Sequence, residues 1–391
     1  MVGGVTVGLD AIVIGGGVVG LCTALKLGEY GYRVKVLEKE CLGCGATGKA
    51  AGIVTKQLFL KHDIELVKES MEFIKKLSKD ANTHLYEEVK SLLIVPESKL
   101  RYVKPILNQY RVTNVPYITL SDVELRRKFN VFKFSEDEIG VVIDGDLVID
   151  PGSFVNALRV RLKELGIEVA EYVDAKLVSY RDEVAVSIGT EVLRADAVVV
   201  AAGVFTSQLL KGLGISLPQL LYRCQVLSLK MKGFPKIFVH DLTNHIYMVW
   251  ETPETVLTGD GHYETISTFE EGLRISQTLF DEVIEGVMSR LSEDVDVELM
   301  NMWAYPCEVT PDGFPRLGKL SMFKNLYIAY GFDGYGLMRG PALAFKLAKL
   351  VAGKADKFVS KYRFMFDPDN VLNYGGKVEV REFHTPLSLL R

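Results

Sequence analysis

Three glycines near the start of the chain have the spacing of a phosphate-binding turn. Gly15-x-Gly17-x-x-Gly20 follows a short apolar run at residues 9–14 and opens a helical pattern that begins at Val18. In such a turn, Gly15 permits the tight bend, Gly17 lets the backbone approach a pyrophosphate, and Gly20 lets the helix pack on the strand. The free N–H groups at the start of a helix attract phosphate.

An acidic residue stands where a nucleotide ribose would be bound. Glu38 ends the apolar segment 33–37, about 20 residues after the glycine turn. Its carboxylate can accept both ribose hydroxyls, and its charge would repel a 2′-phosphate. Strand, turn, helix and acid therefore predict a bound dinucleotide, and the alternative is a glycine turn that binds nothing.

Two further glycine-containing segments have a composition suited to a cofactor. Residues 45–52 (GATGKAAG) are small and polar, and residues 198–203 (VVVAAG) form a second junction between an apolar strand and a glycine. Near the C-terminus lies the third, residues 331–336 (GFDGYG). These local patterns by themselves leave both FAD and NAD open.

The elements that carry these residues alternate between strands and helices. A helix is expected over 18–30, ended by Gly31, and an amphipathic helix over 63–77. Ser121 and Glu124 form a capping box for a helix over 121–128. We expect strands at 91–95, 141–143 and 147–149, with a turn at 144–146, and Asp150-Pro151 leads into a helix over 153–165.

The second half of the chain is richer in strands. Apolar residues 195–201 are typical of a strand buried on both faces. Further strands are expected at 167–169, 176–179, 184–188, 225–229, 237–239, 245–249, 256–258 and 325–329. Residues 269–290 are predicted to be helical, and a closing helix is expected over 341–351.

Nucleotide-binding features at both ends and in the middle indicate interleaved domains. The predicted fold class is α/β (α+β overall), with a Rossmann-like cofactor domain and a substrate domain built on a mainly antiparallel sheet with helices. We expect the cofactor domain to comprise 1–60, 143–215 and 318–360. The substrate domain would comprise 61–142 and 216–317, with a C-terminal tail at 361–391.

Composition excludes several classes of protein. The 391 residues carry a net charge of −4 and no basic block, so nucleic acid is not expected as a partner. Residues 1–25 contain no Lys or Arg, and glycines break their apolar run, which argues against a signal peptide and a membrane span. A cytoplasmic location is the resulting expectation.

The five cysteines, an odd number at irregular spacing, do not form the pattern of a disulfide framework. Cys41-x-x-Cys44 is interpreted as two ordinary thiols, with a redox pair or half a metal site as alternatives. His240 and His245 lack a matching carboxylate cluster and are interpreted as satisfied polar residues. No metal site is predicted.

At this point the chain resembles the FAD-dependent amine oxidoreductases related to D-amino acid oxidase, glycine oxidase and sarcosine oxidase. The resemblance rests on four segments in order: residues 47–52 (TGKAAG), Asp150-Pro151, residues 303–318 with their TPDGFP core, and residues 331–341. It is greatest to the branch of the sarcosine oxidase β-subunit, dimethylglycine dehydrogenase and dye-linked proline dehydrogenase. Cys307 stands near the point where the D-amino acid oxidase branch carries a carboxylate-binding Arg.

The resemblance implies FAD as cofactor and identifies its contacts. FAD is expected to be non-covalent, because the flavin-linking Cys of monomeric sarcosine oxidase aligns with Tyr305. Backbone N–H groups of the closing segment would face the flavin pyrimidine oxygen, where a reduced flavin is anionic. The expected FAD-binding residues are Gly15, Gly17, Val18, Val19, Gly20, Glu38, Lys39, Thr47, Gly48, Lys49, Ala50, Ala51, Gly52, Ala202, Gly203, Gly334, Tyr335, Gly336, Leu337 and Met338.

The implied reaction is hydride transfer from a carbon next to nitrogen to flavin N5, in a small amine or a (secondary) amino acid such as sarcosine, glycine or proline. Lys49, Tyr247, Tyr335 and Arg339 are the catalytic candidates, and Arg339 is the favoured cation for a substrate carboxylate. For Lys49 the alternative is a solvated loop lysine, and for Tyr247 an ordinary core aromatic. Arg223 either approaches the flavin or forms a structural ion pair.

Other readings of the same sequence stay open. One is a 2-hydroxy-acid or glycerol-3-phosphate dehydrogenase on the same fold. Another is an FAD-binding subunit of a multi-subunit electron-transfer complex, and the third is a non-catalytic NAD-binding module. The expected partners are a small amine or amino acid, O₂ or another electron carrier, and a partner subunit or a second copy in a homo-oligomer. Aromatic residues 362–366 are expected to dock on the core or on a partner.

Overall fold

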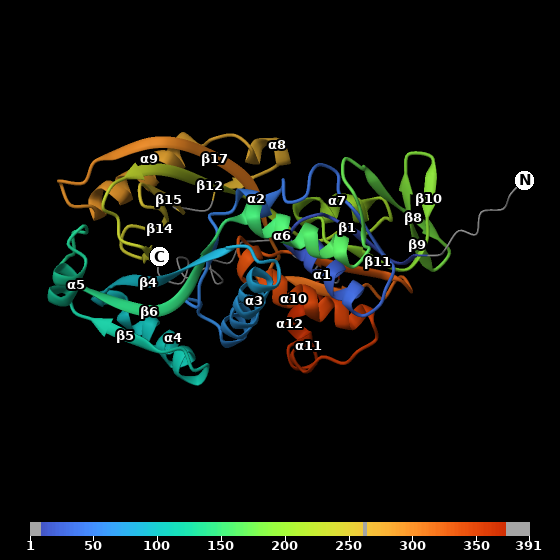
Figure 1. The fold of residues 1–391 in the computed structure, drawn as a ribbon, viewed down its shortest axis with the longest axis horizontal. Coiled ribbons are helices and arrows are strands. Elements are labelled where there is room, and N and C mark those ends of the chain that lie inside the picture. The colour runs from blue at the N-terminus through green and yellow to red at the C-terminus, as the bar shows by residue number, and fades with distance from the viewer. Residues whose placement is uncertain (1–8, 261–263, 373–391) are drawn as a thin grey trace, which may run out of the picture.

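The computed structural model describes residues 9–260 and 264–372. Two large β-sheets lie side by side. Helices pack between them and around the smaller of the two, which is the six-stranded sheet (Figure 1). This mixed α/β arrangement, with one mainly parallel and one mainly antiparallel sheet, confirms the predicted fold class.

The mainly parallel sheet carries the glycine turn. Within the described residues its six strands have the order β18-β19-β11-β1-β2-β7, and only β18 runs antiparallel to its neighbour. Their bounds are β18 Arg316–Lys319, β19 Leu326–Tyr330, β11 Ala195–Val200, β1 Leu9–Ile14, β2 Val34–Leu37 and β7 Glu168–Ala170. Its central strands β1 and β11 are almost entirely apolar, as expected for strands with both faces covered.

Four long helices pack beside this sheet. They are α1 (Val18–Glu29), α3 (Lys61–Asp80), α6 (Pro151–Glu164) and α10 (Gly336–Val351). Helices α1 and α10 contact the strands of the sheet, while α3 packs on α10 and α6 on α1. Helix α10 lies against both α1 and α3 (Figure 1). A small antiparallel sheet of β8 (Ala175–Tyr180), β9 (Glu183–Ile188) and β10 (Glu191–Leu193) adjoins β11.

The mainly antiparallel sheet forms the other half of the molecule. In the part of the chain that is described, its main path is β16-β12-β15-β14-β13-β4-β6-β3, with β17 paired to β12 and β5 to β6. Among the described strands of this sheet, only β13 and β4 pair in parallel. The bounds are β3 Ile53–Val54, β4 Tyr86–Pro96, β5 Tyr117–Leu120, β6 Glu138–Ile149, β12 Leu220–Met231, β13 Ile237–Asp241, β14 Ile246–Thr252, β15 Thr255–Asp260, β16 Thr265–Ile266 and β17 Val297–Val309.

The remaining helices are shorter or peripheral. They are α2 Ala46–Lys49, α4 Leu100–Val112, α5 Asp122–Lys128, α7 Thr206–Lys211, α8 Phe269–Gly272, α9 Gln277–Arg290, α11 Lys357–Lys361, α12 Arg363–Phe366 and α13 Asp369–Leu372, with 3₁₀ turns η1 Glu97–Lys99 and η2 Gly203–Phe205. The predicted capping box of α5 is present. Among the described helices, none is both long and apolar enough to cross a membrane.

The predicted turn at residues 144–146 is wrong. Strand β6 runs without interruption from Glu138 to Ile149 along β4, and the register shifts by a bulge at this point. Gly145 absorbs the bulge with a φ of +73°. Asp146 is buried there and accepts a hydrogen bond from Thr55 Oγ1 at 2.6 Å. Long-range pairing on both sides of the Asp-Gly-Asp sequence thus overrides its local preference for a turn.

Two predicted helix boundaries are also wrong. The helix expected over 269–290 is two helices, because Ser276 caps α9 and its backbone N–H and C=O are bound by the side-chain amide of Gln225. The closing helix α10 begins at Gly336, ahead of Pro341. Helix α4 and the 13-residue strand β17 were not predicted from the sequence.

Segments far apart in the chain contribute to each sheet. Strands from residues 9–37, 168–170, 195–200 and 316–330 make the mainly parallel sheet, and those from 53–149 and 220–309 make the other. The domain boundaries given above stay a prediction. In the tail, Phe366 is buried against the core, and His62 contacts the rings of both Tyr362 and Phe366.

Candidate active site

A single cavity of about 790 Å³ connects the glycine turn with the antiparallel sheet. One end is lined by Gly15, Gly17 and Glu38, and the other by residues of β12, β13 and β14, including Tyr222, His240 and Tyr247. The cavity is more apolar than polar in its lining, as is usual for a cofactor site.

The glycine turn has the geometry that its spacing predicts. Gly15 has a φ of +115°, and a Cβ on it would lie 2.3 Å from Ala201 O. A Cβ on Gly20 would lie 1.9 Å from Gly15 O, so only glycine lets α1 approach the turn this closely. At Gly17 the nearest atom to such a Cβ is Thr47 Oγ1, at 3.2 Å. Protein atoms therefore fill the space next to Gly15 and Gly20, whereas Gly17 borders the cavity.

Glu38 is held at the end of β2 by backbone donors. Its carboxylate accepts the N–H of Gly16 at 2.5 Å and that of Glu40 at 2.8 Å. Each carboxylate oxygen has two lone pairs, so capacity remains for ribose hydroxyls. Helix α2 is fixed nearby, because Thr47 Oγ1 accepts the N–H of Val18 at 3.0 Å.

The sheet containing β17 closes over the segment 45–52. Trp303 Nε1 donates to the carbonyl of Lys49 at 2.8 Å. A Cβ on Gly45 would lie 3.2 Å from the hydroxyl of Tyr305. Since successive odd-numbered residues of β17 point to one face of its sheet, that face covers the cavity.

The N-terminus of α10 forms another wall. No side chain within residues 9–260 and 264–372 caps this 16-residue helix. Its first residues, Gly336, Leu337 and Met338, line the cavity together with Gly334 and Tyr335. The positive end of its dipole can therefore stabilise negative charge inside the cavity.

Aromatic and carboxylic side chains gather at the end farther from the glycine turn. Tyr222 donates a hydrogen bond to Asp333 Oδ1 at 2.8 Å. Burial raises the pKa of Tyr247, so its hydroxyl stays protonated at neutral pH. Burial also lowers the pKa of His240 to about 4, which leaves the imidazole neutral.

Two buried carboxyl groups in this region were missed by the sequence analysis. Burial raises the pKa of Asp333 to about 7, against the opposing effects of Arg339 and the Tyr222 hydrogen bond. Burial raises the pKa of Glu308 to about 7 as well, although it accepts the N–H of Gly331 at 2.9 Å. Asp333 also has a left-handed φ of +52°, unusual outside glycine and typical of functional loops. The position of Asp333 between Phe332 and Gly334, in the glycine-rich segment, was the signal that the sequence offered for a functional residue. Its burial could not be predicted, because burial depends on the folded chain.

Most of the predicted FAD contacts come together around the cavity. The residues that line it are Gly15, Gly17, Val18, Val19, Glu38, Lys39, Thr47, Lys49, Ala50, Ala51, Gly52, Ala202, Gly203, Gly334, Tyr335, Gly336, Leu337 and Met338. Gly20 and Gly48 are not part of the lining. A Cβ on Gly48 would lie 2.4 Å from Gly43 O, so both glycines serve close backbone packing behind it.

The catalytic candidates divide differently. Lys49, Tyr247 and Tyr335 line the cavity, but Arg339 does not. Its guanidinium is buried, pairs with Asp63 at 3.2 Å and donates to Phe332 O at 2.8 Å. It lies over the ring of Tyr335 and so supports the wall from behind. The structure thus does not fit Arg339 as the cation for a substrate carboxylate.

Arg223 does line the cavity, but it is also engaged in an ion pair. Its guanidinium lies 3.2 Å from Glu264 Oε1 and donates to Glu271 O at 3.0 Å. The structural ion pair, one of the two readings made from the sequence, is therefore present, and an approach of Arg223 to the flavin stays a prediction.

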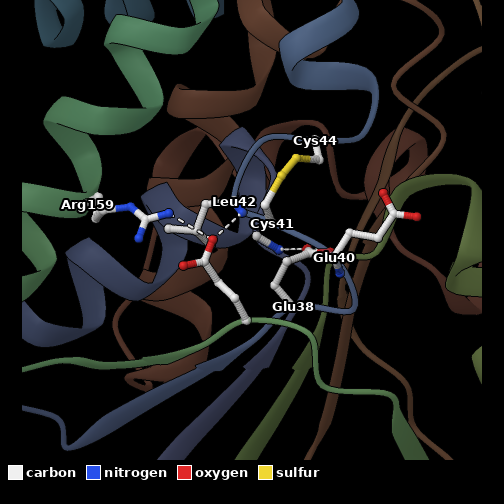
Figure 2. Close-up of a disulfide and its surroundings, with 8 residues drawn as sticks. Glu38, Glu40, Cys41, Leu42, Cys44 and Arg159 are labelled. Atoms are coloured by element: carbon white, nitrogen blue, oxygen red, sulfur yellow. Dashed lines mark hydrogen bonds and ion pairs between the residues drawn. A yellow bond between two sulfur atoms is a disulfide. The ribbon is translucent and has the colours of Figure 1, made fainter.

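The interpretation of the cysteines is wrong. Cys41 and Cys44 form a disulfide in the loop after Glu38, which lies beside Glu40 and the Leu42–Glu171–Arg159 contacts (Figure 2). Cys224 and Cys307 form a second disulfide between β12 and β17. Their 83-residue separation explains why sequence spacing did not reveal it. Among residues 9–260 and 264–372, no group of His, Cys, Asp and Glu side chains is arranged to hold a metal ion.

Comparison with known proteins identifies the class of protein. The family described as FAD dependent oxidoreductase matches residues 10–350, and the chain belongs to this family. It is accordingly an FAD-dependent oxidoreductase.

Individual relatives are distant. The chain is 25% identical to peroxisomal sarcosine oxidase of Mus musculus, over 85% of this chain and 90% of the relative. It is 24% identical to 4-methylaminobutanoate oxidase (formaldehyde-forming) of Paenarthrobacter nicotinovorans, over 89% of this chain but only 44% of that longer protein.

Solved structures share the fold. L-proline dehydrogenase from P. horikoshii superposes with a TM-score of 0.83 at 22% identity, covering 92% of this chain and 97% of that one. Glycine oxidase from Bacillus cereus gives a TM-score of 0.77 at 20% identity, covering 90% and 97% of the two chains.

The residues of the cavity fit FAD. A phosphate cradle bordered by Gly17, a ribose-binding carboxylate at Glu38 and an uncapped helix N-terminus at α10 line one continuous space. These are the recognition groups that a long dinucleotide with an electron-rich ring requires.

Proposed function

We propose that this enzyme oxidises the C–N bond of a small amine or a secondary amino acid, such as sarcosine, glycine or proline. The carrying observation is the cavity that joins the FAD cradle to a buried end with tyrosines and Asp333. Support also comes from the relatives, whose names include sarcosine oxidase, glycine oxidase and L-proline dehydrogenase.

We assign FAD to the cavity-lining residues named above. The N–H groups at the start of α1 would hold the pyrophosphate, and Glu38 the adenosine ribose. The start of α10 would face the pyrimidine ring. Non-covalent binding is supported at two positions. The family resemblance places Tyr305 at the position of the flavin-linking Cys, and Cys307 is already bonded to Cys224.

Bound FAD would supply a hydride acceptor, and the protein must deliver a neutral amine to it. An amine with a pKa near that of lysine, about 10.4, arrives protonated at neutral pH. Of the two buried carboxyl groups that line the cavity, Glu308 and Asp333, Asp333 is the one that Tyr222 orients by a hydrogen bond. In its ionised form it can accept the ammonium proton. Tyr247 and the neutral His240 would exclude water from the same end.

Lys49 is the proposed cation for a substrate carboxylate in place of Arg339. It lies on α2 at the cavity wall, and the carbonyl of the same residue is fixed by Trp303. Arg223 is the second candidate, although Glu264 already neutralises it.

An anaerobic spectrum tests the proposed function. The purified holoprotein is expected to be yellow and to bleach with at least one of sarcosine, L-proline, glycine or another amino acid. Recolouring on admission of air would identify an oxidase, and slow recolouring a dehydrogenase with another acceptor. Bleaching by a 2-hydroxy acid while the whole amine panel stays inert would overturn the proposal.

Asp333 gives this enzyme an expected pH dependence. Since only the ionised carboxylate accepts the ammonium proton, kcat/KM should rise with pH through about 7, the pKa of Asp333. Asp333→Asn should remove this inflection and lower kcat/KM by about 100-fold, a typical contribution of acid–base catalysis. The amine's own ionisation, near pH 10, is well separated.

Glu308→Gln is the matched control for this experiment. Glu308 is also buried and has a pKa of about 7, but it is bonded to the backbone of Gly331. The inflection should therefore persist in Glu308→Gln. An inflection that survives in Asp333→Asn and disappears in Glu308→Gln would assign the proton acceptor to Glu308 and refute the role of Asp333.

The domain boundaries, the cytoplasmic location, the electron acceptor and any partner subunit stay predictions. The small organic substrate is the partner that the cavity supports.

A further inference from the structure

The disulfide between Cys224 and Cys307 lies on a sheet face directed at the cofactor cavity. In the antiparallel pairing of β12 and β17, Cys224 is opposite Tyr305 and Cys307 is opposite Tyr222. Residues two apart along a strand share a face, so the two cysteines and the two tyrosines all lie on one side of the sheet. All four line the cavity.

Contacts along β17 place Cys307 between two segments of the cavity wall. On one side of Cys307, Tyr305 and Trp303 contact the segment 45–52. On the other side, Glu308 accepts the backbone N–H of Asp333 and, through its carboxylate, that of Gly331. Cys307 thus lies between the two segments that the resemblance places against the flavin.

The disulfide between Cys41 and Cys44 provides an internal contrast. Cys41 and Cys44 are joined in the loop after Glu38, yet neither lines the cavity. Cys224 and Cys307 are only half-buried and face it. A redox reaction inside the cavity would therefore reach Cys224 and Cys307 but not Cys41 and Cys44.

We propose that Cys224 and Cys307 are a second two-electron centre of this enzyme, reduced from the disulfide to the dithiol by the reduced flavin. The S–S bond breaks and two S–H bonds form, which takes up two electrons and two protons. Both electrons and one proton come from the reduced cofactor, which returns to its oxidised form, and the second proton comes from solvent. The inference rests on FAD binding in this cavity, as in the proposed function, but not on which substrate reduces it.

Thiol counting in a Cys41→Ser/Cys44→Ser holoenzyme tests the proposal. This variant keeps Cys22, Cys224 and Cys307, so the oxidised protein should contain one free thiol, the buried Cys22. The bound flavin is reduced anaerobically by light and EDTA, which requires no knowledge of the substrate. The protein is then alkylated in denaturant, and labelled cysteines are counted and located by mass spectrometry.

The expected count rises from one thiol to three, with the two new labels on Cys224 and Cys307. Complete bleaching should consume four electrons per flavin. In the matched Cys224→Ser/Cys307→Ser variant the count should stay at one and bleaching should consume two electrons. Apoprotein under the same light should gain no thiol, which excludes direct reduction by the reagents.

A count that stays at one after full bleaching would overturn the proposal and leave the pair as a structural cross-link. A count of three before reduction would overturn it as well, because no disulfide would be present. Each of these two contradicting results could be obtained with a protein that oxidises amines. The expected result could equally be obtained with a protein that does not oxidise amines. Failure of this inference and failure of the proposed function are therefore distinguishable.

Discussion

Replacing Gly17 by alanine is expected to weaken FAD binding at least tenfold, about 1.4 kcal/mol, and to leave the fold intact. Gly17 has an ordinary φ of −81°, so an alanine there is not strained. Its Cβ would lie 3.2 Å from Thr47 Oγ1 and would narrow the cradle at which a pyrophosphate approaches the backbone. FAD titration of the apoprotein by flavin fluorescence measures the affinity, and circular dichroism checks the fold.

Gly31→Ala is the control for this substitution. Gly31 has a φ of +86°, and a Cβ on it meets no atom within 4 Å. Alanine there should cost about 1 kcal/mol of stability through backbone strain and leave FAD affinity unchanged. Wild-type FAD affinity in Gly17→Ala would show that the pyrophosphate lies elsewhere.

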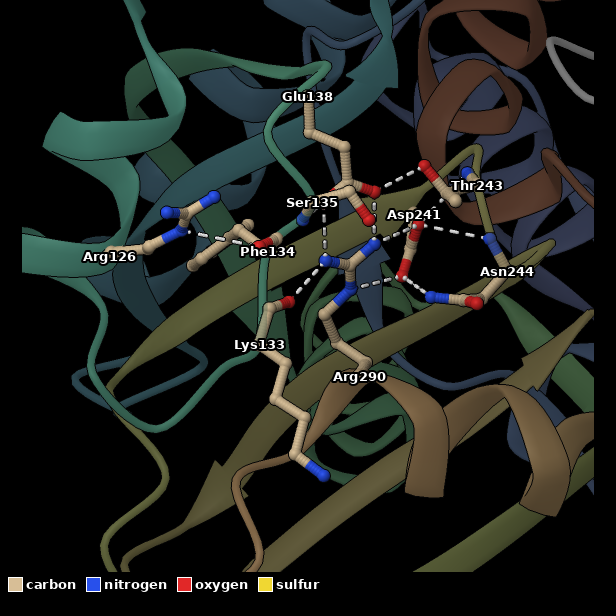
Figure 3. Close-up of polar contacts among 9 residues, drawn as sticks. All are labelled: Arg126, Lys133, Phe134, Ser135, Glu138, Asp241, Thr243, Asn244 and Arg290. Atoms are coloured by element: carbon tan, nitrogen blue, oxygen red, sulfur yellow. Dashed lines mark hydrogen bonds and ion pairs between the residues drawn. The ribbon is translucent and has the colours of Figure 1, made fainter.

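Replacing Arg290 by methionine is expected to lower the free energy of unfolding by about 3–5 kcal/mol. Arg290 at the end of α9 is buried between Glu138, at the start of β6, and Asp241, at the end of β13 (Figure 3). It pairs with Glu138 at 2.7 Å and with Asp241 at 2.6 Å. Its removal would leave two buried carboxylates without their cation. A shift in the urea midpoint or in Tm, at constant FAD, measures the effect.

A surface pair provides the comparison for Arg290. Lys324 and Asp182 form an ion pair with both side chains more than half exposed. Lys324→Met should therefore change stability by less than about 1 kcal/mol. Adding Glu138→Gln and Asp241→Asn to Arg290→Met should recover part of the loss, because it removes the uncompensated charges. An equally small effect in both single variants would contradict this account of the buried cluster.

Local sequence was sufficient wherever neighbouring residues determine the geometry. The tight approach between Gly15 and Gly20 involves residues within one turn of the chain, and Glu38 follows on the next strand. The same holds for the capping box of Ser121 and Glu124. Their spacing therefore predicted both the structure and the cofactor class, and the ordered motifs extended this to the family.

Long-range contacts decided the rest of the site. Arg339 was expected to bind substrate, but its guanidinium forms an ion pair with Asp63, which lies on a helix distant in sequence. The Asp144-Gly145-Asp146 sequence became a bulge because β4 pairs on both sides of it.

The sequence by itself determined a dinucleotide cradle, because turns and caps are made by residues close along the chain. Its ordered motifs, through their resemblance to a known family, extended this to an FAD-dependent oxidoreductase. Only the tertiary structure decided which carboxyl groups lose their water, at Asp333 and Glu308, and which cysteines meet, at Cys224 and Cys307. Burial and cross-strand pairing depend on segments that approach each other only after folding, so no local pattern encodes them.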